Sequence, residues 1–495
     1  MKDLKARAIR GGFAKVCAQG ANFVLRIGSL MVLARLLDPK DFGLVGMVTA
    51  VTGVLSLFKD FGLSTASVQR SSVTEEQVST LFWINLLVGV ALCSLTILAA
   101  PFIVRFYHEP ALFWVTIVLA LGFLFNAAGV QHGAILQRDM RFTTLSLIDI
   151  VSLILSTSIG IGMAIRGYGY WALVGMTLCG PLVSTIYVIL VTRWVPGKPR
   201  RGVGIGSLMR FGGTITLNGL VVYFAYNLEK VLLGRFWGAS VVGIYGRAYQ
   251  LSNIPTENLN SSIGGVAFSA LSRVQHDPVR LRSYFLKCYS LVLALSVPLT
   301  ILGALFAVDA ISVLLGPKWR EAAPIFRLLT PTILTFAMIN PFAWLLFSMG
   351  KVRRSLHIAL VITPLVIAGY LIGLPYGPKG VALGYSVAMG LWILPHILWC
   401  VHGTSISVRD VFQTLIKPLL SSLVAALLPF ALQVFCGNLL SPLLRVAIGV
   451  TIFLFIYCGM LLYVMGQKSF YLDLLRGLRS GTAVDSDAIA VAQPG

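Results

Sequence analysis

The sequence predicts an all-α integral membrane protein with about fourteen transmembrane helices. Apolar residues make up 57% of its 495 residues and charged residues only 12%, and the mean hydropathy is +0.86. An ordinary globular protein is far less apolar than this. Most apolar runs are 20 to 27 residues long, which matches helices that cross a hydrocarbon core about 30 Å thick at about 1.5 Å per residue.

The apolar runs, separated by charged or Pro/Gly-rich breaks, give the helices in order. We expect them at 11–35, 41–62, 78–104, 110–134, 143–165, 169–192, 208–234, 238–262, 283–308, 322–348, 355–374, 378–401, 411–434 and 442–465. The helix over 238–262 is the least regular, because Asn253, Pro255 and Glu257 interrupt it. The tail over 466–495 begins amphipathic and ends in small and acidic residues, so we expect a short interfacial helix followed by disorder.

An internal repeat divides these helices into two halves. A shift of 200 residues without a gap matches Gly12 with Gly212, Leu33 with Leu233, Arg35 with Arg235, Gly43 with Gly243 and Gly46 with Gly246. Two six-helix copies keep the same membrane orientation, which is typical of transporters with parallel repeats and a substrate site between the halves. We expect six-helix bundles at 1–200 and 201–405, two extra helices at 406–465 and a cytoplasmic tail at 466–495.

The basic residues predict the orientation. Of 39 Lys and Arg, 23 fall in the N-terminus and the even-numbered loops and nine in the odd-numbered loops, so the positive-inside rule places both termini in the cytoplasm. The net charge of +21 is thus mainly a topology signal, and we expect no nucleic-acid partner. The first apolar run lacks a small-residue cleavage site, so we expect it to stay as the first helix.

The sequence has few of the features that mark an enzyme, a metal site or a cofactor site. The seven cysteines have no C-x-x-C spacing, and we expect neither a metal nor a cofactor. The longest loop between helices, residues 193–207, is too short for a catalytic domain. We therefore expect a protein that is not an enzyme.

Two arginines lie deep in predicted helices, where a charge costs about 2.5 to 3.5 kcal/mol on the insertion scale. Arg26 is about 22 Å along the first helix, and Arg247 lies on the helix that matches the second one by the repeat. A guanidinium suits bidentate binding of phosphate oxygens. We expect both arginines at the cleft as contacts of a substrate phosphate, with pairing to an acid such as Glu229 as the alternative. Lys15, one turn inside the first helix, is a substrate candidate that can also simply snorkel to the interface.

Glu229 and Lys230 are neighbours in sequence and therefore face different sides of their helix. We expect Glu229 to face the interior and Lys230 to snorkel outward. Asp149 lies near the end of its predicted helix, and we expect it to anchor that helix at the interface.

The stretch 252–265 is the candidate gate or hinge, with Pro255, Glu257, Gly264 and Gly265. Proline removes a backbone hydrogen bond, and polar groups in a membrane are tolerated only where they face protein or a wet cavity. The alternative is that this stretch is the cytoplasmic end of its helix.

Five motifs resemble those of a known family. They are Leu33-Ala-Arg-Leu-Leu-Asp-Pro-Lys-Asp-Phe-Gly43, Phe61-Gly-Leu-Ser-Thr-Ala-Ser-Val-Gln-Arg70, Leu136-Gln-Arg-Asp-Met-Arg-Phe142, Asn227-Leu-Glu-Lys230 and Gly243-Ile-Tyr-Gly-Arg-Ala-Tyr249. With the helix count and length, the chain resembles the bacterial polysaccharide exporters of the Wzx type, in the multidrug/oligosaccharidyl-lipid/polysaccharide (MOP) flippase superfamily. The resemblance adds Asn227 to the substrate candidates. Glu229 stands where the family more usually has Asp, which leaves its role open.

The resemblance implies a lipid-linked oligosaccharide carried on undecaprenyl pyrophosphate. Such a repeat unit is expected to cross the bacterial inner membrane by alternating access, for exopolysaccharide or lipopolysaccharide synthesis. Membrane lipid and the pathway's polymerase and chain-length proteins are the implied partners. Because the sequence has no ATP-binding motif, the energy must come from an ion gradient, the membrane potential or consumption of the product.

Two other functions stay open. A cation-coupled multidrug exporter of the same superfamily would have an acidic cavity. A membrane polymerase or ligase acting on lipid-linked sugars would have a long periplasmic loop with catalytic side chains.

Overall fold

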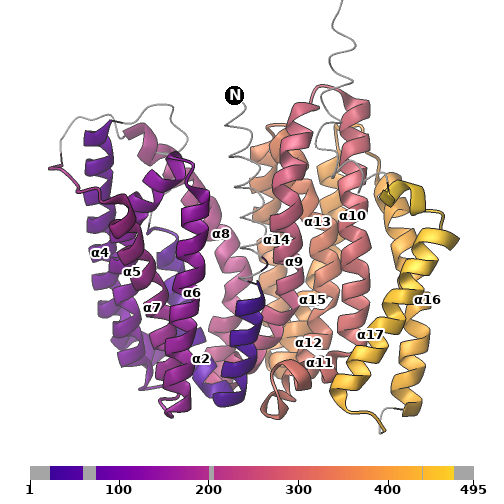
Figure 1. Ribbon diagram of the computed structural model, residues 1–495, viewed down its shortest axis with the longest axis horizontal. Helices are drawn as coiled ribbons and strands as arrows, with labels where there is room; N and C mark the ends of the chain where they lie inside the picture. Colours follow the sequence, from indigo (N-terminus) through magenta and orange to yellow (C-terminus); the bar gives the residue numbers. More distant parts are fainter. Residues whose placement is uncertain (1–19, 21–22, 60–73, 200–205, 437–438, 473–495) are drawn as a thin grey trace, which may run out of the picture. The chain divides into compact units, whose positions relative to one another are not determined.

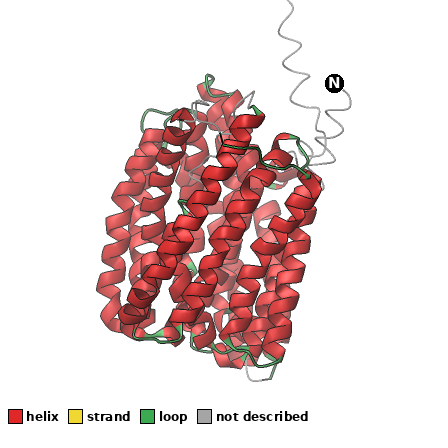
Figure 2. Ribbon diagram, turned by 90° about the vertical axis from the view of Figure 1, so that its left-hand side faces the viewer, coloured by secondary structure: helices red, strands yellow, loops and turns green. Residues whose placement is uncertain are grey.

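The computed structural model describes residues 20, 23–59, 74–199, 206–436 and 439–472. Across these ranges the regular secondary structure is helical, without a strand (Figure 2). Residues 23–36 form the described part of the first predicted helix. Lys15 lies outside the described residues.

The long helices follow closely the apolar runs of the sequence, and Figure 1 labels them along the chain. They are α2 (Pro39–Ser56), α4 (Glu75–Tyr107), α5 (Leu112–Arg138), α6 (Phe142–Ile165), α7 (Tyr170–Thr192), α8 (Gly206–Trp237), α9 (Ala239–Arg273), α10 (Pro278–Leu305), α13 (Pro331–Ser348), α14 (Val352–Gly373), α15 (Gly377–Val401), α16 (Val408–Cys436) and α17 (Pro442–Gly459). The short elements are α11 (Ala307–Leu314), α12 (Ala322–Leu329), the 3-10 turns η1 (Pro317–Trp319) and η2 (Leu374–Tyr376), and the π-helical turn η3 (Met460–Val464).

Nine helical stretches within the described residues are long and apolar enough to cross a membrane. The prediction of an all-α, multi-pass membrane protein is therefore confirmed. The helix over residues 23–36, α2, α8 and α9 are not among the nine, so the count of fourteen spans stays a prediction.

Three details differ from the sequence prediction. The interrupted helix expected over 238–262 is wrong in its bounds, because α9 continues unbroken past Pro255 to Arg273. The stretch expected over 322–348 has the predicted bounds as a candidate membrane span, but it divides at Thr330 into α12 and α13. Pro331 begins α13, and proline favours the first position of a helix. The short helix α11 was not expected at all. Of the expected interfacial helix, residues 468–472 are helical, and the rest of the tail lies outside the described residues.

The turn between the first two helices is built by its own sequence. Pro39 begins α2, where its missing N–H would have no helical partner in any case. The backbone N–H of Asp38 donates to a carboxylate oxygen of Asp41 at 3.0 Å. This local pairing satisfies one backbone donor at the helix start.

The chain packs into two compact units. Unit 1 comprises residues 1–251, 311–329 and 353–389. In its first part, α5 packs against α4 and α7, α6 packs against α7, and α2 contacts α5, α7 and α8. Figure 1 shows α4 to α7 as a group of long helices standing beside one another. Buried Leu92, Ala120 and Phe123 join α4 to α5, while Leu87 and Leu98 of α4 point outward with 70% and 74% exposure, as lipid-facing side chains do.

Unit 2 comprises residues 252–310, 330–352 and 390–495. In it α10 contacts α13 and α16, and α16 pairs with α17, the two yellow helices of Figure 1. Phe306, Phe453 and Tyr457 form its apolar core, and the Tyr457 hydroxyl donates to the carbonyl oxygen of Ala294 at 2.7 Å. The predicted bundle boundaries at residues 200 and 405 stay predictions.

Candidate functional site

A polar cavity of about 530 Å³ lies in unit 1, between the first helix, α5, α6 and α7. Such a cavity is unusual among helices whose sequences are almost entirely apolar, because each polar group must find a partner there. Its polar lining consists of Arg26, Asn126, Asp149, Ser152, Ser156, Ser184 and Thr185.

Arg26 and Asp149 carry the two opposite charges of this cavity. They are close enough to interact electrostatically, which reduces the cost of holding each charge between apolar helices. The Arg26 side chain is exposed within the described structure, so its guanidinium is accessible. A phosphate can pair with this guanidinium through two of its oxygens, as a carboxylate does.

The hydroxyl groups of the cavity differ in what they already bond. Thr185 donates to the carbonyl oxygen of Phe125 at 2.7 Å, and Ser156 donates to its own helix. The Ser152 hydroxyl is buried and has no hydrogen-bond partner among the described residues. Ser152 is thus a ready donor or acceptor for a polar ligand. In the described part of the chain no cluster of three or more His, Cys, Asp and Glu side chains could hold a metal.

Glu229 lies fully buried in α8, with 0% exposure. Neither carboxylate oxygen has a hydrogen-bond partner in another described residue. Tyr223, Tyr245 and Tyr370 are close enough to interact with its charge. The expectation that Glu229 faces the interior is therefore confirmed, and aromatic side chains surround it.

The expectation that Lys230 snorkels outward is wrong. It is half-buried, donates to the Asn227 side-chain oxygen at 2.8 Å, and its ammonium lies 5.8 Å from the centre of the Tyr249 ring. This partner set keeps the charge inside, because a hydrogen bond and a π face together replace part of its hydration. Asn227 and Lys230 thus form one polar pair next to Glu229.

Arg247 lies on α9 and is half-buried. Its guanidinium carbon is 4.2 Å from the centre of the Phe42 ring, and it donates to the side-chain oxygen of Gln250. Arg247 does not line the cavity that Arg26 lines. The structure therefore does not bring the two deep arginines to one cavity.

The N-terminal ends of α2 and α9 meet in a glycine contact that follows the repeat. A side chain on Gly43 would collide with the carbonyl oxygen of Ala239, and one on Gly243 with the carbonyl oxygen of Pro39. Residues 39 and 239, like 43 and 243, are separated by the 200-residue shift of the repeat. We call these four residues the glycine contact. Glycine at both positions lets the two backbones approach closely.

A second set of contacts lies at the same end of unit 1. Arg35 donates to the carbonyl oxygen of Val313 at 2.8 Å, and Lys318 pairs with Asp38 at 2.7 Å. Trp319 is fully buried, and its indole N–H donates to a backbone carbonyl of the first helix at 2.7 Å. We call Arg35, Asp38, Lys318 and Trp319 the end cluster. Residues almost 300 positions apart in the chain are thus tied together.

The predicted hinge residues lie on one continuous helix. Pro255 is inside α9, and Glu257 accepts a hydrogen bond from Asn253 at 2.6 Å. A side chain on Gly264 would lie 2.8 Å from the indole nitrogen of Trp344, whereas Gly265 has open space around it. The change from unit 1 to unit 2 falls between residues 251 and 252, close to Pro255 on the chain.

Sequence reasoning missed two parts of the site. Asp149, expected to anchor its helix at the interface, lines the cavity with Arg26; its distance of seven residues from the start of α6 was the available signal. Trp319 and the end cluster were also missed, because nothing in the sequence pairs residues 34–38 with 313–319.

Comparisons with known proteins identify the family of this chain. The model of the "Polysaccharide biosynthesis protein" family matches residues 32–324. The chain is 26% identical over 442 residues to the lipopolysaccharide biosynthesis protein WzxC of Escherichia coli K12, covering 87% of this chain and 89% of that protein. It is 27% identical to the teichuronic acid biosynthesis protein TuaB of Bacillus subtilis 168, covering 76% and 78% of the two chains. It is 24% identical to the succinoglycan biosynthesis transport protein ExoT of Rhizobium meliloti 1021, covering 63% and 64%.

Solved structures show the same fold. A lipid II flippase MurJ in an inward closed conformation superimposes with a TM-score of 0.73 at 14% identity, over 94% of this chain and all of that one. An inward-facing multidrug resistance MATE transporter of the MOP superfamily gives 0.61 at 14% identity, over 79% and 95%. The prediction of a non-enzyme agrees with these relatives. The expected resemblance is confirmed: the chain belongs to the polysaccharide biosynthesis protein family.

Proposed function

We propose that the protein flips lipid-linked oligosaccharide repeat units, carried on undecaprenyl pyrophosphate, across the bacterial inner membrane. The observation that carries this proposal is the cavity with Arg26, whose guanidinium is accessible between apolar helices. A pyrophosphate cannot enter hydrocarbon without partners, and a fixed guanidinium supplies charged hydrogen bonds in place of water.

The lining beyond Arg26 suits the sugar part of the substrate. Ser152, Ser184 and Asn126 offer donors and acceptors for a hydroxyl-rich ligand. Asp149 lines the same cavity and interacts electrostatically with Arg26 while no phosphate is bound. The prenyl chain stays in the lipid, so the cavity has to accommodate only the polar head.

The finer topology is part of the same proposal. Fourteen spans form two six-helix bundles at 1–200 and 201–405, followed by two helices at 406–465, with both termini in the cytoplasm. The glycine contact and the end cluster are then the closed periplasmic side, and the helix around Pro255, Glu257, Gly264 and Gly265 bends as the halves rock. Arg247, Lys15, Glu229, Lys230 and Asn227 are proposed as further substrate contacts on the route.

The partners follow from the pathway. A flipped repeat unit is consumed by a polymerase and by chain-length proteins on the periplasmic side, and this consumption can pull transport forward. With no ATP-binding motif in the sequence, an ion gradient or the membrane potential is the other source of energy.

The test uses the purified full chain in proteoliposomes that contain a fluorescent oligosaccharide on undecaprenyl pyrophosphate. A membrane-impermeant quencher added outside bleaches only the outer leaflet. We expect bleaching to continue beyond this fraction with the wild type and to stop at it in protein-free vesicles. Bleaching identical to that of protein-free vesicles would overturn the proposal.

One observation supports a second candidate function, cation-coupled export of drugs. Asp149 gives the cavity a carboxylate, which a cation-coupled multidrug exporter of the same superfamily would use. The same vesicles distinguish the two functions. An exporter would use an ion gradient to accumulate a cationic dye, and it would leave the lipid-linked sugar in its original leaflet.

A further inference from the structure

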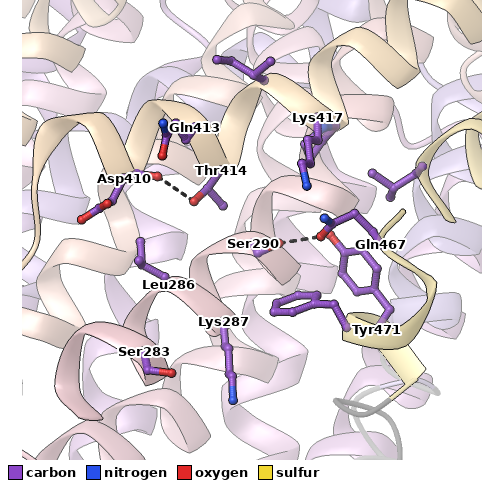
Figure 3. Close-up of a pocket in the computed structure, with 14 residues that line it drawn as sticks. Ser283, Leu286, Lys287, Ser290, Asp410, Gln413, Thr414, Lys417, Gln467 and Tyr471 are labelled. Atoms are coloured by element: carbon purple, nitrogen blue, oxygen red, sulfur yellow. Dashed lines mark hydrogen bonds between the residues drawn. The ribbon is translucent and has the colours of Figure 1, made fainter. Parts of the chain in front are cut away.

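A second cavity lies within unit 2, and its lining shares no residue with that of the Arg26 cavity. It has a volume of about 640 Å³ and lies between α10, α16 and residues 461–471 (Figure 3). This volume is in the range of small-molecule and cofactor sites, about 300 to 1,000 Å³.

Two lysines at matching positions line this cavity. Lys287 and Lys417 are each the tenth residue of their helix, since α10 begins at Pro278 and α16 at Val408. The two helix starts adjoin, because the Ser405 hydroxyl donates to the carbonyl oxygen of Pro278 at 2.7 Å. Both lysines are therefore about 14 Å along their helices, inside stretches apolar enough to span a membrane.

The acidic residue of the lining is already neutralised. Asp410 accepts two hydrogen bonds from the Arg282 guanidinium, at 2.9 and 2.7 Å. This bidentate pair is the strong form of an Arg–carboxylate interaction. The cavity lining is therefore left with two positive charges from its lysines.

The remaining lining combines polar side chains with a larger apolar surface. Ser290 and Tyr471 are joined through their hydroxyl groups at 3.1 Å (Figure 3), which ties the segment after η3 to α10. Gln413 and Gln467 supply further donors, and Leu286 and Leu461 an apolar wall. A ligand for this lining needs an anionic head and an apolar chain.

We propose that this cavity binds the phosphate headgroup of an anionic glycerophospholipid, with Lys287 and Lys417 as the basic side chains of its lining. Snorkelling explains a single lysine at this depth, but it does not explain two lysines from different helices that line one cavity whose carboxylate has its own partner. The bound headgroup joins α10, α16 and the segment around Tyr471. This inference does not depend on the proposed flipping activity.

The test is native mass spectrometry of the delipidated full chain, titrated with phosphatidylglycerol and, separately, with phosphatidylcholine. We expect wild type to prefer phosphatidylglycerol. The double variant Lys287→Gln/Lys417→Gln should lose about tenfold or more in this affinity, because a lysine near an anionic headgroup contributes about 1 kcal/mol. Lys287→Arg/Lys417→Arg keeps both charges and should keep the preference, which separates loss of charge from misfolding. Lys468→Gln removes a neighbouring exposed lysine that does not line the cavity, and should bind as wild type does.

Other outcomes overturn the proposal. Equal binding of the two lipids by wild type, or unchanged binding by the double Gln variant, would show that the lysines bind no headgroup. Competition by millimolar inorganic phosphate as effective as that by the lipid would identify a soluble phosphate ligand. Displacement of phosphatidylglycerol by equimolar undecaprenyl pyrophosphate would assign the cavity to the transported lipid.

Discussion

At the scale of single residues, the surroundings of a charged side chain indicate whether it is available to a ligand or stabilises the fold. Arg26 is accessible in a polar cavity with Asp149, whereas Arg445 has an inward structural role. Its guanidinium pairs with Asp309 at 2.8 Å, and the two side chains are only 18% and 3% exposed. One arginine is available to a ligand and the other is committed to the fold.

Arg26→Ala should lower the rate of flipping about tenfold or more. The lost charged hydrogen bonds are worth about 1.5 to 3 kcal/mol, and about 1.4 kcal/mol is a factor of ten. Arg26→Lys should keep part of the activity, because lysine keeps the charge but not the bidentate geometry. The quencher assay on proteoliposomes measures both. Arg166→Ala, an exposed arginine at the end of α6, is the control, and equal rates for Arg26→Ala and this control would contradict the role of Arg26.

Asp309→Asn should lower the free energy of unfolding by about 3 to 5 kcal/mol, because it leaves Arg445 buried without its counter-charge. A lower midpoint of thermal unfolding in detergent measures this. The matched control is Glu109→Gln, whose partner Lys40 is 56% exposed; a surface pair contributes about 0 to 1 kcal/mol. If both variants unfold at the wild-type temperature, the Asp309–Arg445 pair does not contribute to the stability of the fold.

At the scale of elements, the repeat and the packing agree. The sequence shift of 200 residues predicted equivalent glycines, and the structure places Gly43 and Gly243 in one contact between α2 and α9. Helix–helix contacts at backbone distance tolerate no larger side chain.

Gly243→Val should therefore open the end of unit 1. We would measure the labelling of a cysteine placed at Ala34, which is 0% exposed, by a membrane-impermeant maleimide. Labelling should be severalfold faster in the Gly243→Val background. Gly246→Val adds the same side chain one turn further along α9, where no atom lies within 4 Å of an added Cβ, and should leave labelling slow. Equal labelling in both backgrounds would show that the glycine contact does not close this end.

The sequence predicted the elements far better than the contacts between them. Apolar runs and proline or glycine breaks depend on local chemistry, so almost every long helix was predicted to within a few residues. The predicted end of the helix that contains Pro255 was wrong, because a proline inside a long helix removes one hydrogen bond without ending the helix. Glu229 was correctly placed inside, but the inward Lys230 and the cavity position of Asp149 depend on Asn227, Tyr249 and Arg26, which are neighbours only after folding.

At the scale of the whole molecule, the proposed alternating access predicts that the end cluster separates in each cycle. Asp38 and Lys318 are joined at 2.7 Å, although 280 residues lie between them in the chain. A covalent bridge at this place would hold the end of unit 1 closed. If the protein works by alternating access, such a bridge must stop flipping while the fold stays intact.

The pair Asp38→Cys/Lys318→Cys, joined by a short bis-maleimide reagent, should therefore abolish flipping in the quencher assay. Each single cysteine variant treated with the same reagent is the control for reaction at native cysteines and should retain the rate of its untreated form. The unbridged double variant should also flip, because the exposed ion pair itself contributes about 1 kcal/mol or less. Full flipping by the bridged protein would mean that the substrate crosses while this end stays closed, and alternating access through the end cluster would have to be abandoned.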